Sequence, residues 1–276
     1  MLPELPADQL VKLALLGFSV GTVGAMVGVG GGFLLVPALA LFIFNDMHHS
    51  YITSISLAAV LGNALSASIG YRQRRIQDFR TAGILITMAV PAAAVGKVLN
   101  ITVDPKAFYP VFGGALIAGA VYLLARTLLE KGSQEPAAKG RSRHIVERSG
   151  RTYDYRVNEP IAASFAPPAG FVAGFFGIGG GIVNVPVMLT VLRMPANVAV
   201  ATSQLELVCA AATALALQFL ATSGSLTMLG ISIPDPAGCT MESWEWPAVI
   251  VAASTMVGAQ LGVRLAPKVG ARFVLG

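Results

Sequence analysis

A glycine-rich motif occurs twice in this chain, and it restricts the fold more than any other feature. Residues 28–37 read GVGGGFLLVP and residues 177–186 read GIGGGIVNVP, so the second copy follows the first by 149 residues. Thr53 and Ser54 recur at Thr202 and Ser203 with the same spacing. A shared register over this length indicates an internal duplication. Because glycines destabilise a helix interior, each copy is predicted to contain a helix broken at the glycines.

The segments around the motif are apolar enough to lie in a membrane. Of the 276 residues, 55% are hydrophobic and 12% are charged, whereas soluble domains carry about 25% charged residues. Apolar segments that reach the length of a membrane span lie at 11–44, 52–71, 81–99, 108–128, 161–192, 198–222 and 247–266. The predicted fold class is therefore an all-α polytopic membrane protein.

The two segments that contain the glycines are too long for a single crossing. A straight helix over 11–44 would reach about 50 Å, whereas the hydrocarbon core of a bilayer measures about 30 Å. We therefore expect each half to contain a helical hairpin that turns at the glycines, followed by about three transmembrane helices. The second half has no apolar segment equivalent to 108–128 before residue 276, so its last helix is expected to be absent or truncated.

The loop charges predict that the halves are inverted repeats. Basic residues cluster within 72–80, 126–156 and 264–272, and by the positive-inside rule these places face the cytoplasm. The loop 223–246 has no Lys or Arg and contains acidic residues, with Trp244 and Trp246 as interface anchors. Equivalent helices thus end on opposite sides of the membrane. We expect a first membrane repeat at 1–129, a cytoplasmic linker at 130–160, partly disordered or a short hairpin, and a second membrane repeat at 161–276, with the N-terminus outside.

The duplicated Gly-Gly-Gly-x-x-x-Val-Pro motif, followed each time by Thr-Ser at the start of the next helix, resembles the sulfite exporter TauE/SafE family of membrane permeases. The resemblance covers about residues 10–273. It implies a multi-pass protein of the bacterial inner membrane that transports small sulfur-containing anions such as sulfite, sulfonates or sulfoacetate. The absent last helix departs from the pattern of the family.

The glycines are predicted to bind the anion through the backbone. A helix that begins in the middle of the membrane presents unpaired N–H groups at the positive end of its dipole. Two such ends facing each other would form an oxyanion cradle, although small residues can also serve only to let helices pack closely. The predicted ligands in the two motifs are Gly30, Gly31, Gly32, Phe33, Gly179, Gly180, Gly181 and Ile182.

Polar side chains near the motifs are further candidates for substrate binding. They are Thr53, Ser54, Asn63, Asn184, Thr202, Ser203 and Gln204. Their hydroxyl and amide groups could bind sulfonate oxygens or join helices by hydrogen bonds. Asn63 and Asn184 have the apolar repeat partners Ala212 and Leu35, so the halves differ chemically, as an asymmetric substrate requires.

Two ionisable residues lie within predicted membrane helices. Glu206 lies in an apolar helix, where a charged group is costly and functional by default. It is our candidate for proton coupling, and the alternative is a structural acid that joins two helices. Lys97 is close to the outer end of its helix, so we expect its side chain to extend to the interface, where it could attract anions.

Motifs that the sequence lacks exclude several other classes of function. The glycine motifs have no Lys-Ser/Thr pair of a nucleotide-binding loop, so we expect a secondary transporter that works by alternating access with protons as the coupling ion. We expect no enzymatic activity, cofactor, metal site or nucleic-acid partner. The sequence is compatible with an oligomer. The alternative is an anion channel that uses helix dipole ends.

Overall fold

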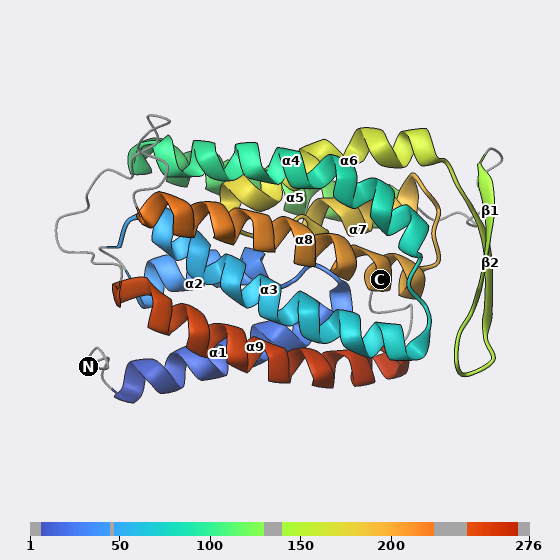
Figure 1. The fold of residues 1–276 in the computed structure, drawn as a ribbon, viewed down its shortest axis with the longest axis horizontal. Coiled ribbons are helices and arrows are strands. Elements are labelled where there is room, and N and C mark those ends of the chain that lie inside the picture. The colour runs from blue at the N-terminus through green and yellow to red at the C-terminus, as the bar shows by residue number, and fades with distance from the viewer. Residues whose placement is uncertain (1–6, 45–46, 130–139, 224–241, 270–276) are drawn as a thin grey trace.

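The computed structural model describes residues 7–44, 47–129, 140–223 and 242–269 (Figure 1). Its elements are α1 (Ala7–Val27), α2 (Gly32–Phe42), α3 (His49–Arg74), α4 (Phe79–Thr102), α5 (Pro105–Leu129), β1 (Arg141–Val146), β2 (Thr152–Val157), α6 (Glu159–Phe176), α7 (Gly181–Thr190), α8 (Ala196–Thr222) and α9 (Glu242–Val269). Among the described helices, α1, α3, α4, α8 and α9 are long and apolar enough to cross a membrane. The predicted all-α polytopic fold is confirmed, and each predicted apolar segment is helical.

The predicted breaks in the helices occur at the glycines. The chain turns between α1 and α2 and again between α6 and α7, so each motif forms the tip of a helical hairpin. Backbone φ angles are positive at Gly28, Gly30 and Gly31 in the first tip and at Gly177 and Gly179 in the second. Residues with a Cβ rarely adopt this conformation, which explains why glycine occupies these positions. We call residues 28–31 the first tip and residues 177–180 the second tip.

The two halves are inverted and intertwined. In Figure 1 the α1–α2 hairpin enters the bundle from one end and the α6–α7 hairpin enters from the other. Helix α1 packs against α9, and its equivalent α6 packs against α4, so each hairpin leans on a helix of the other repeat. Helices α3 and α8 cross between these pairs and contact each other. Because of this exchange, both repeats contribute helices to the centre of the bundle.

Small residues allow the outer helix pairs to approach closely. A Cβ atom at Gly170 or Gly174 of α6 would collide with the backbone of Ala89 or Ala93 in α4, and one at Gly96 would collide with the carbonyl of Phe171. The α1–α9 pair is built in the same way, with Gly258 against Phe18 and Gly262 against Thr22. Membrane helices associate through such backbone proximity because lipid supplies no hydrophobic driving force between them.

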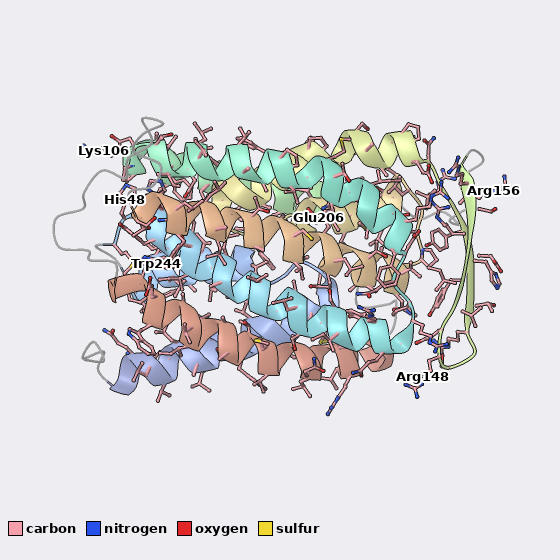
Figure 2. The ribbon with its side chains drawn as sticks, viewed as in Figure 1. His48, Lys106, Arg148, Arg156, Glu206 and Trp244 are labelled. Carbon is pink, nitrogen blue, oxygen red and sulfur yellow. The ribbon has the colours of Figure 1, made fainter. Side chains whose placement is uncertain are left out.

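The linker forms an antiparallel β-hairpin across one end of the bundle (Figure 1). Its residues 140–157 are ordered as the short hairpin that the sequence allowed, and residues 130–139 lie outside the described part of the chain. We call this end the strand end and the opposite one the His48 end. Figure 2 shows Arg148 and Arg156 at the strand end and His48, Lys106 and Trp244 at the other.

Ion pairs fasten the β-hairpin to the helices. Arg74 donates to Glu147 at 2.7 Å, and Tyr155 donates to Asp78, the N-cap residue of α4, at 2.9 Å. Burial would raise the pKa of Glu147, but hydrogen bonds and the charge of Arg74 lower it below its ordinary value. Burial and the charge of Asp78 raise the pKa of Tyr155, so its hydroxyl stays protonated as a donor. The hairpin thereby holds the end of α3 and the start of α4 together.

The close packing of α4 on α6 leads to a first prediction. Gly96→Leu forces a side chain against the backbone of Phe171 and is expected to destabilise the protein by about 3 kcal/mol through overpacking. Gly83→Leu on the same helix is the matched control, because a Cβ there meets nothing within 4 Å. Thermal unfolding followed by size-exclusion chromatography in detergent measures both. Equal stability of the two variants would contradict the packing.

Candidate functional site

The two glycine tips contact each other in the interior of the bundle. A Cβ at Gly32 would lie 2.7 Å from the Cα of Ile178, and a Cβ at Gly181 would lie 2.6 Å from the Cα of Val29. Val29 and Ile178 occupy equivalent places in the two motifs, 149 residues apart. The contact is therefore reciprocal, and only residues without side chains allow it. Close packing thus explains part of the glycine requirement, although between the tips rather than along two helices.

Each tip also presents unpaired backbone donors. The first backbone hydrogen bonds of α2 and α7 are accepted by Gly31 and Gly180. The backbone N–H groups of the cap residue and of the first two helical residues have no acceptor among the described residues. They belong to Gly31, Gly32, Phe33, Gly180, Gly181 and Ile182. Two helix N-termini with free N–H groups therefore lie side by side, and this is the geometry in which helix ends bind anions.

A buried carboxyl group lies beside the second tip. Glu206 on α8 is 0% exposed and lies midway between the two ends of the bundle in Figure 2. Its Oε2 accepts a hydrogen bond of 2.7 Å from Nδ2 of Asn184, whereas Oε1 has no partner in the part of the chain that the structure describes. Oε1 is 3.4 Å from the position of a Cβ at Gly180. The predicted residues Asn184 and Glu206 thus meet at the start of α7.

Two buried amide side chains complete the polar surroundings of the tips. Gln204 is 0% exposed, and neither end of its amide has a partner among the described residues. It lies on α8 between Val200, which contacts Gly28, and Leu207, which contacts Gly30 and Gly179. Asn63 on α3 donates to the carbonyl of Gly30 at 3.4 Å, and its Oδ1 is unpaired. Unpaired buried polar atoms are rare in proteins and call for an explanation.

Hydroxyl groups from the opposite repeat hold the tips in place. Ser203 of α8 donates to the carbonyl of Gly28 at 3.1 Å, and Ser56 of α3 donates to that of Gly177 at 2.8 Å. Gly28 and Gly177 are equivalent positions of the duplication. Ser56 belongs to the same polar segment at the start of α3 as Thr53 and Ser54, and its repeat partner is the apolar Leu205.

The other predicted hydroxyl groups lie apart from one another. Thr202 accepts a hydrogen bond from the backbone N–H of Asp78 at 3.0 Å, toward the strand end. Thr53 packs against Gly177, and both Thr53 and Ser54 contact the side chain of Lys97. The bundle therefore does not gather the two Thr-Ser pairs at one place, and their role as substrate ligands stays a prediction.

The expectation that Lys97 extends to the membrane interface is wrong. Its side chain is 0% exposed and lies between α3 and α4. No local pattern indicates this burial, because Lys97 lies only a turn and a half from the helix end. The packing of α4 on α6 directs it inward.

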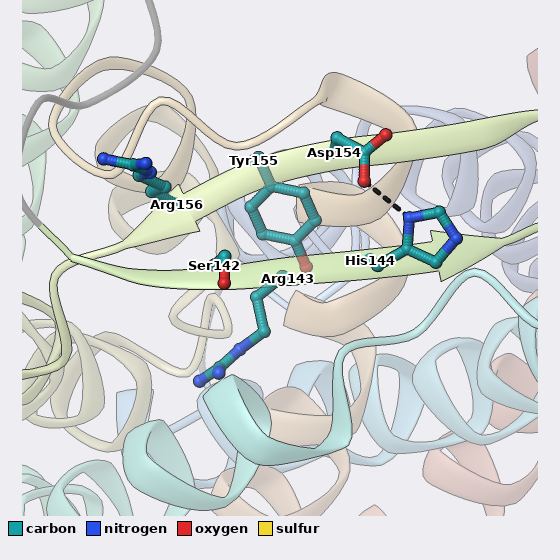
Figure 3. A pocket seen from close by; sticks show the side chains of 6 residues that line it. All are labelled: Ser142, Arg143, His144, Asp154, Tyr155 and Arg156. Atoms are coloured by element: carbon teal, nitrogen blue, oxygen red, sulfur yellow. Dashed lines mark hydrogen bonds and ion pairs between the residues drawn. The ribbon is translucent and has the colours of Figure 1, made fainter.

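One cavity lies at the strand pair, and another borders the second tip through Ile178. A pocket of about 400 Å³ at the strand pair is lined by Ser142, Arg143, His144, Asp154, Tyr155 and Arg156 (Figure 3). Its Arg143 already pairs with Asp78 and Glu159, and His144 pairs with Asp154. The second cavity, of about 520 Å³ between α5, α6 and α7, has an apolar lining. Neither combines unpaired donors with burial as the tips do.

Comparison with known proteins agrees with the doubled hairpin. The family model described as "Sulfite exporter TauE/SafE" matches residues 13–275. The chain belongs to the TauE/SafE family. Its relatives include the probable membrane transporter proteins YunE of Bacillus subtilis and MJ0441 of Methanocaldococcus jannaschii, each 30% identical over 203 residues. These alignments cover 71% and 70% of this chain, and 72% and 66% of the two relatives. No solved structure gives a significant match.

Membership of the TauE/SafE family confirms the resemblance that the doubled motif predicted. It makes the protein a membrane transporter, and its relatives are named as probable membrane transporters. The reciprocal tips, their unpaired amides, Gln204 and the Asn184–Glu206 pair form the candidate site of this transporter.

The reciprocal contact of the tips yields a second prediction. Gly32→Ala and Gly181→Ala each press a Cβ against backbone of the other tip, so each is expected to cost about 2 kcal/mol of stability. Because either substitution already separates the tips, the double variant should lose clearly less than the sum of the single losses. Thermal unfolding of the purified variants measures this, with Gly113→Ala, where a Cβ meets nothing within 4 Å, as the control. Strict additivity would show that the two contacts are independent.

Proposed function

We propose that this TauE/SafE transporter carries a small sulfur-containing anion of the sulfite, sulfonate or sulfoacetate type across the bacterial inner membrane by alternating access. The observation that carries the proposal is the meeting of two helix N-termini with unpaired amides in the interior of an inverted repeat. In membrane transporters of this kind, broken helices bind the anionic group of the substrate at their N-terminal ends.

The chemistry around the tips favours an oxyanion. Amide N–H groups and the amide of Gln204 donate hydrogen bonds, and an SO₃ group offers three acceptor oxygens in a compact arrangement. The absence of side chains at the glycines lets an anion approach the backbone closely. The name of the family points to sulfite, and the donors at the tips suit sulfite and sulfonates alike.

Glu206 supports coupling to protons. A carboxylate with a single hydrogen bond from Asn184 is costly to keep charged in the interior. Its negative charge would also repel an anion at the amide of Gly180 nearby. Binding of the anion and protonation of Glu206 therefore favour each other, and such linkage is reciprocal. Proton and anion would then move together.

The contact between the tips supports a carrier over the alternative of an anion channel. A channel needs a continuous path through the membrane, whereas Gly32 and Gly181 lie against the opposite tip. Rocking of the two hairpins about this contact would open the site to one side at a time. Neither transport mechanism requires an enzymatic step.

The orientation and the domain boundaries are part of the proposal. Basic residues of α3, α4, the β-hairpin and α9 gather at the strand end, which by the positive-inside rule lies in the cytoplasm. The His48 end and the N-terminus then lie outside. Residues 1–129 and 161–276 would form the two membrane repeats, joined by the cytoplasmic linker 130–160.

A transport assay tests the substrate class. Proteoliposomes containing the protein are expected to show saturable uptake of radiolabelled sulfite or of a sulfonate, with competition by other members of this class. Phosphate and chloride serve as controls that should compete poorly. No saturable uptake of any sulfur anion would contradict the substrate class, and ohmic single-channel current would contradict the carrier.

Substitution of Glu206 tests the coupling. In Glu206→Gln the side chain keeps its shape but cannot exchange a proton, so we expect uptake to lose its dependence on an imposed pH gradient while anion binding changes less than about threefold. Glu245→Gln, at the start of α9 and away from the tips, is the matched control. Unchanged dependence on the gradient in Glu206→Gln would make this residue a structural acid.

A further inference from the structure

Lys97 places a positive charge in the interior without a matching negative one. Its Nζ donates to Ser54 Oγ and Asn100 Oδ1 at 3.0 Å, and to Thr53 Oγ1 and the carbonyl of Ser50 at 3.3 Å. These four oxygens are neutral, and no carboxylate of the described residues pairs with Nζ. A buried ion without a counter-ion is strongly unfavourable. The site therefore lacks a negative charge.

The end of α6 supplies only a fraction of that charge. Asn100 accepts from Lys97 through Oδ1 and donates through Nδ2 to the carbonyl of Phe175 in the last turn of α6, at 2.8 Å. A helix C-terminus carries the equivalent of about half a negative charge. The hydrogen bonds of the ammonium group are thus satisfied, while most of its positive charge has no compensating negative charge.

The fold does not need a cation at this position. Gly96 lies against the carbonyl of Phe171, and Gly262 lies against that of Thr22. Because Thr22 and Phe171 are equivalent residues, 149 positions apart, the residues after the two glycines are equivalent as well. These are Lys97 and Val263, and Val263 belongs to an apolar cluster. The second repeat builds the same helix contact without a charge, which indicates that Lys97 serves a ligand.

Unpaired polar atoms surround Lys97. Gln218 of α8 accepts a hydrogen bond from Ser50 at 3.0 Å, and its Nε2 donor has no partner within the described ranges. His49 forms a hydrogen bond through Nε2 with the carbonyl of Asn100 at 2.9 Å, leaving Nδ1 unpaired. Both side chains are at most 1% exposed. Gln218 and Lys97 both bind Ser50, so an amide donor and an uncompensated cation belong to one cluster, and an oxyanion requires such groups.

Aromatic rings close one side of this cluster, and the second tip closes another. The ring of His49 stacks on Phe108 with centroids 4.3 Å apart, and Phe108 lies 5.8 Å from Phe175. Thr53, a ligand of Lys97, packs against Gly177 of the second tip. The apolar wall excludes water and strengthens electrostatic attraction. The cluster is therefore continuous with the candidate site, toward its His48 end.

We propose that Lys97, together with Gln218, forms an anion subsite on the His48 side of the second tip, where it binds the oxygens of a sulfite or sulfonate group. This inference rests on the proposed function and adds to it. The tip amides carry only partial charges, whereas Lys97 contributes the full positive charge that neutralises the anion. Only the first repeat places a lysine at this position, because its equivalent in the second repeat is Val263, so the pathway is electrically asymmetric.

Binding of radiolabelled sulfite to the purified protein in lipid nanodiscs tests the subsite. Lys97→Met removes the charge and keeps the length of the side chain, and we expect it to weaken sulfite binding at least about thirtyfold. Lys97→Arg should retain binding within about fivefold because it keeps the charge. Lys106→Met, an exposed lysine at the same end of the bundle (Figure 2), should bind as the wild type does.

Thermal unfolding without ligand separates this role from a structural one. Loss of an unmatched buried charge should leave the melting temperature of Lys97→Met unchanged or higher. Lys97→Met that binds sulfite as tightly as the wild type would overturn the subsite, and so would a lower melting temperature with unchanged affinity. If Lys97→Met does not fold, Gln218→Leu replaces it and is expected to weaken sulfite binding about tenfold.

The failure of the subsite differs from the failure of the proposed function. If the wild type binds sulfite and the variants at Lys97 and Gln218 do so equally well, the transported class stands and the subsite is wrong. If the wild type binds neither sulfite nor any sulfonate, the proposed substrate class fails and this subsite fails with it.

Discussion

The reciprocal backbone contact between the two glycine tips is the constraint on which the rest of the structure depends. Gly32 lies against Ile178 and Gly181 against Val29, so two helices end and two begin at one place in the interior. Their unpaired amides follow from that meeting. The exchange of helices also follows from it, because each hairpin packs against a helix of the other repeat when its tip lies at the centre.

Two uncompensated ionisable groups flank the second tip. Glu206 contacts the start of α7 through Asn184, and Lys97 reaches the tip through Thr53. Under the two proposals, an anion at Lys97 and a proton on Glu206 neutralise both groups together, so loading the site would leave the net charge of the interior unchanged. Moving a neutral loaded site through the membrane avoids the large penalty for an unmatched charge. This gives a physical reason for the transport of anion and proton as a pair.

Much of the fold could be read from the sequence because it follows from local requirements. Triple glycine cannot continue a helix, apolar length fixes the spans, and a shared spacing of 149 residues marks the duplication. Asn184 and Glu206 were found because polar groups stand out in apolar helices. The contact of Ser56 with Gly177 and the burial of Lys97 could not be predicted, because the first depends on a carbonyl 121 residues away and the second on how α4 packs against α6.

The sequence by itself determined an all-α membrane protein of two inverted repeats with a helix broken at each glycine motif. Composition, period and loop charge act within single segments, and they need no knowledge of neighbours. Only the tertiary structure decided that the tips touch, that Thr202 lies toward the strand end while Thr53 and Ser54 surround Lys97, and that this lysine is buried. These outcomes depend on which helices of the two repeats pack together, and a helix face has no partner until the whole bundle is assembled.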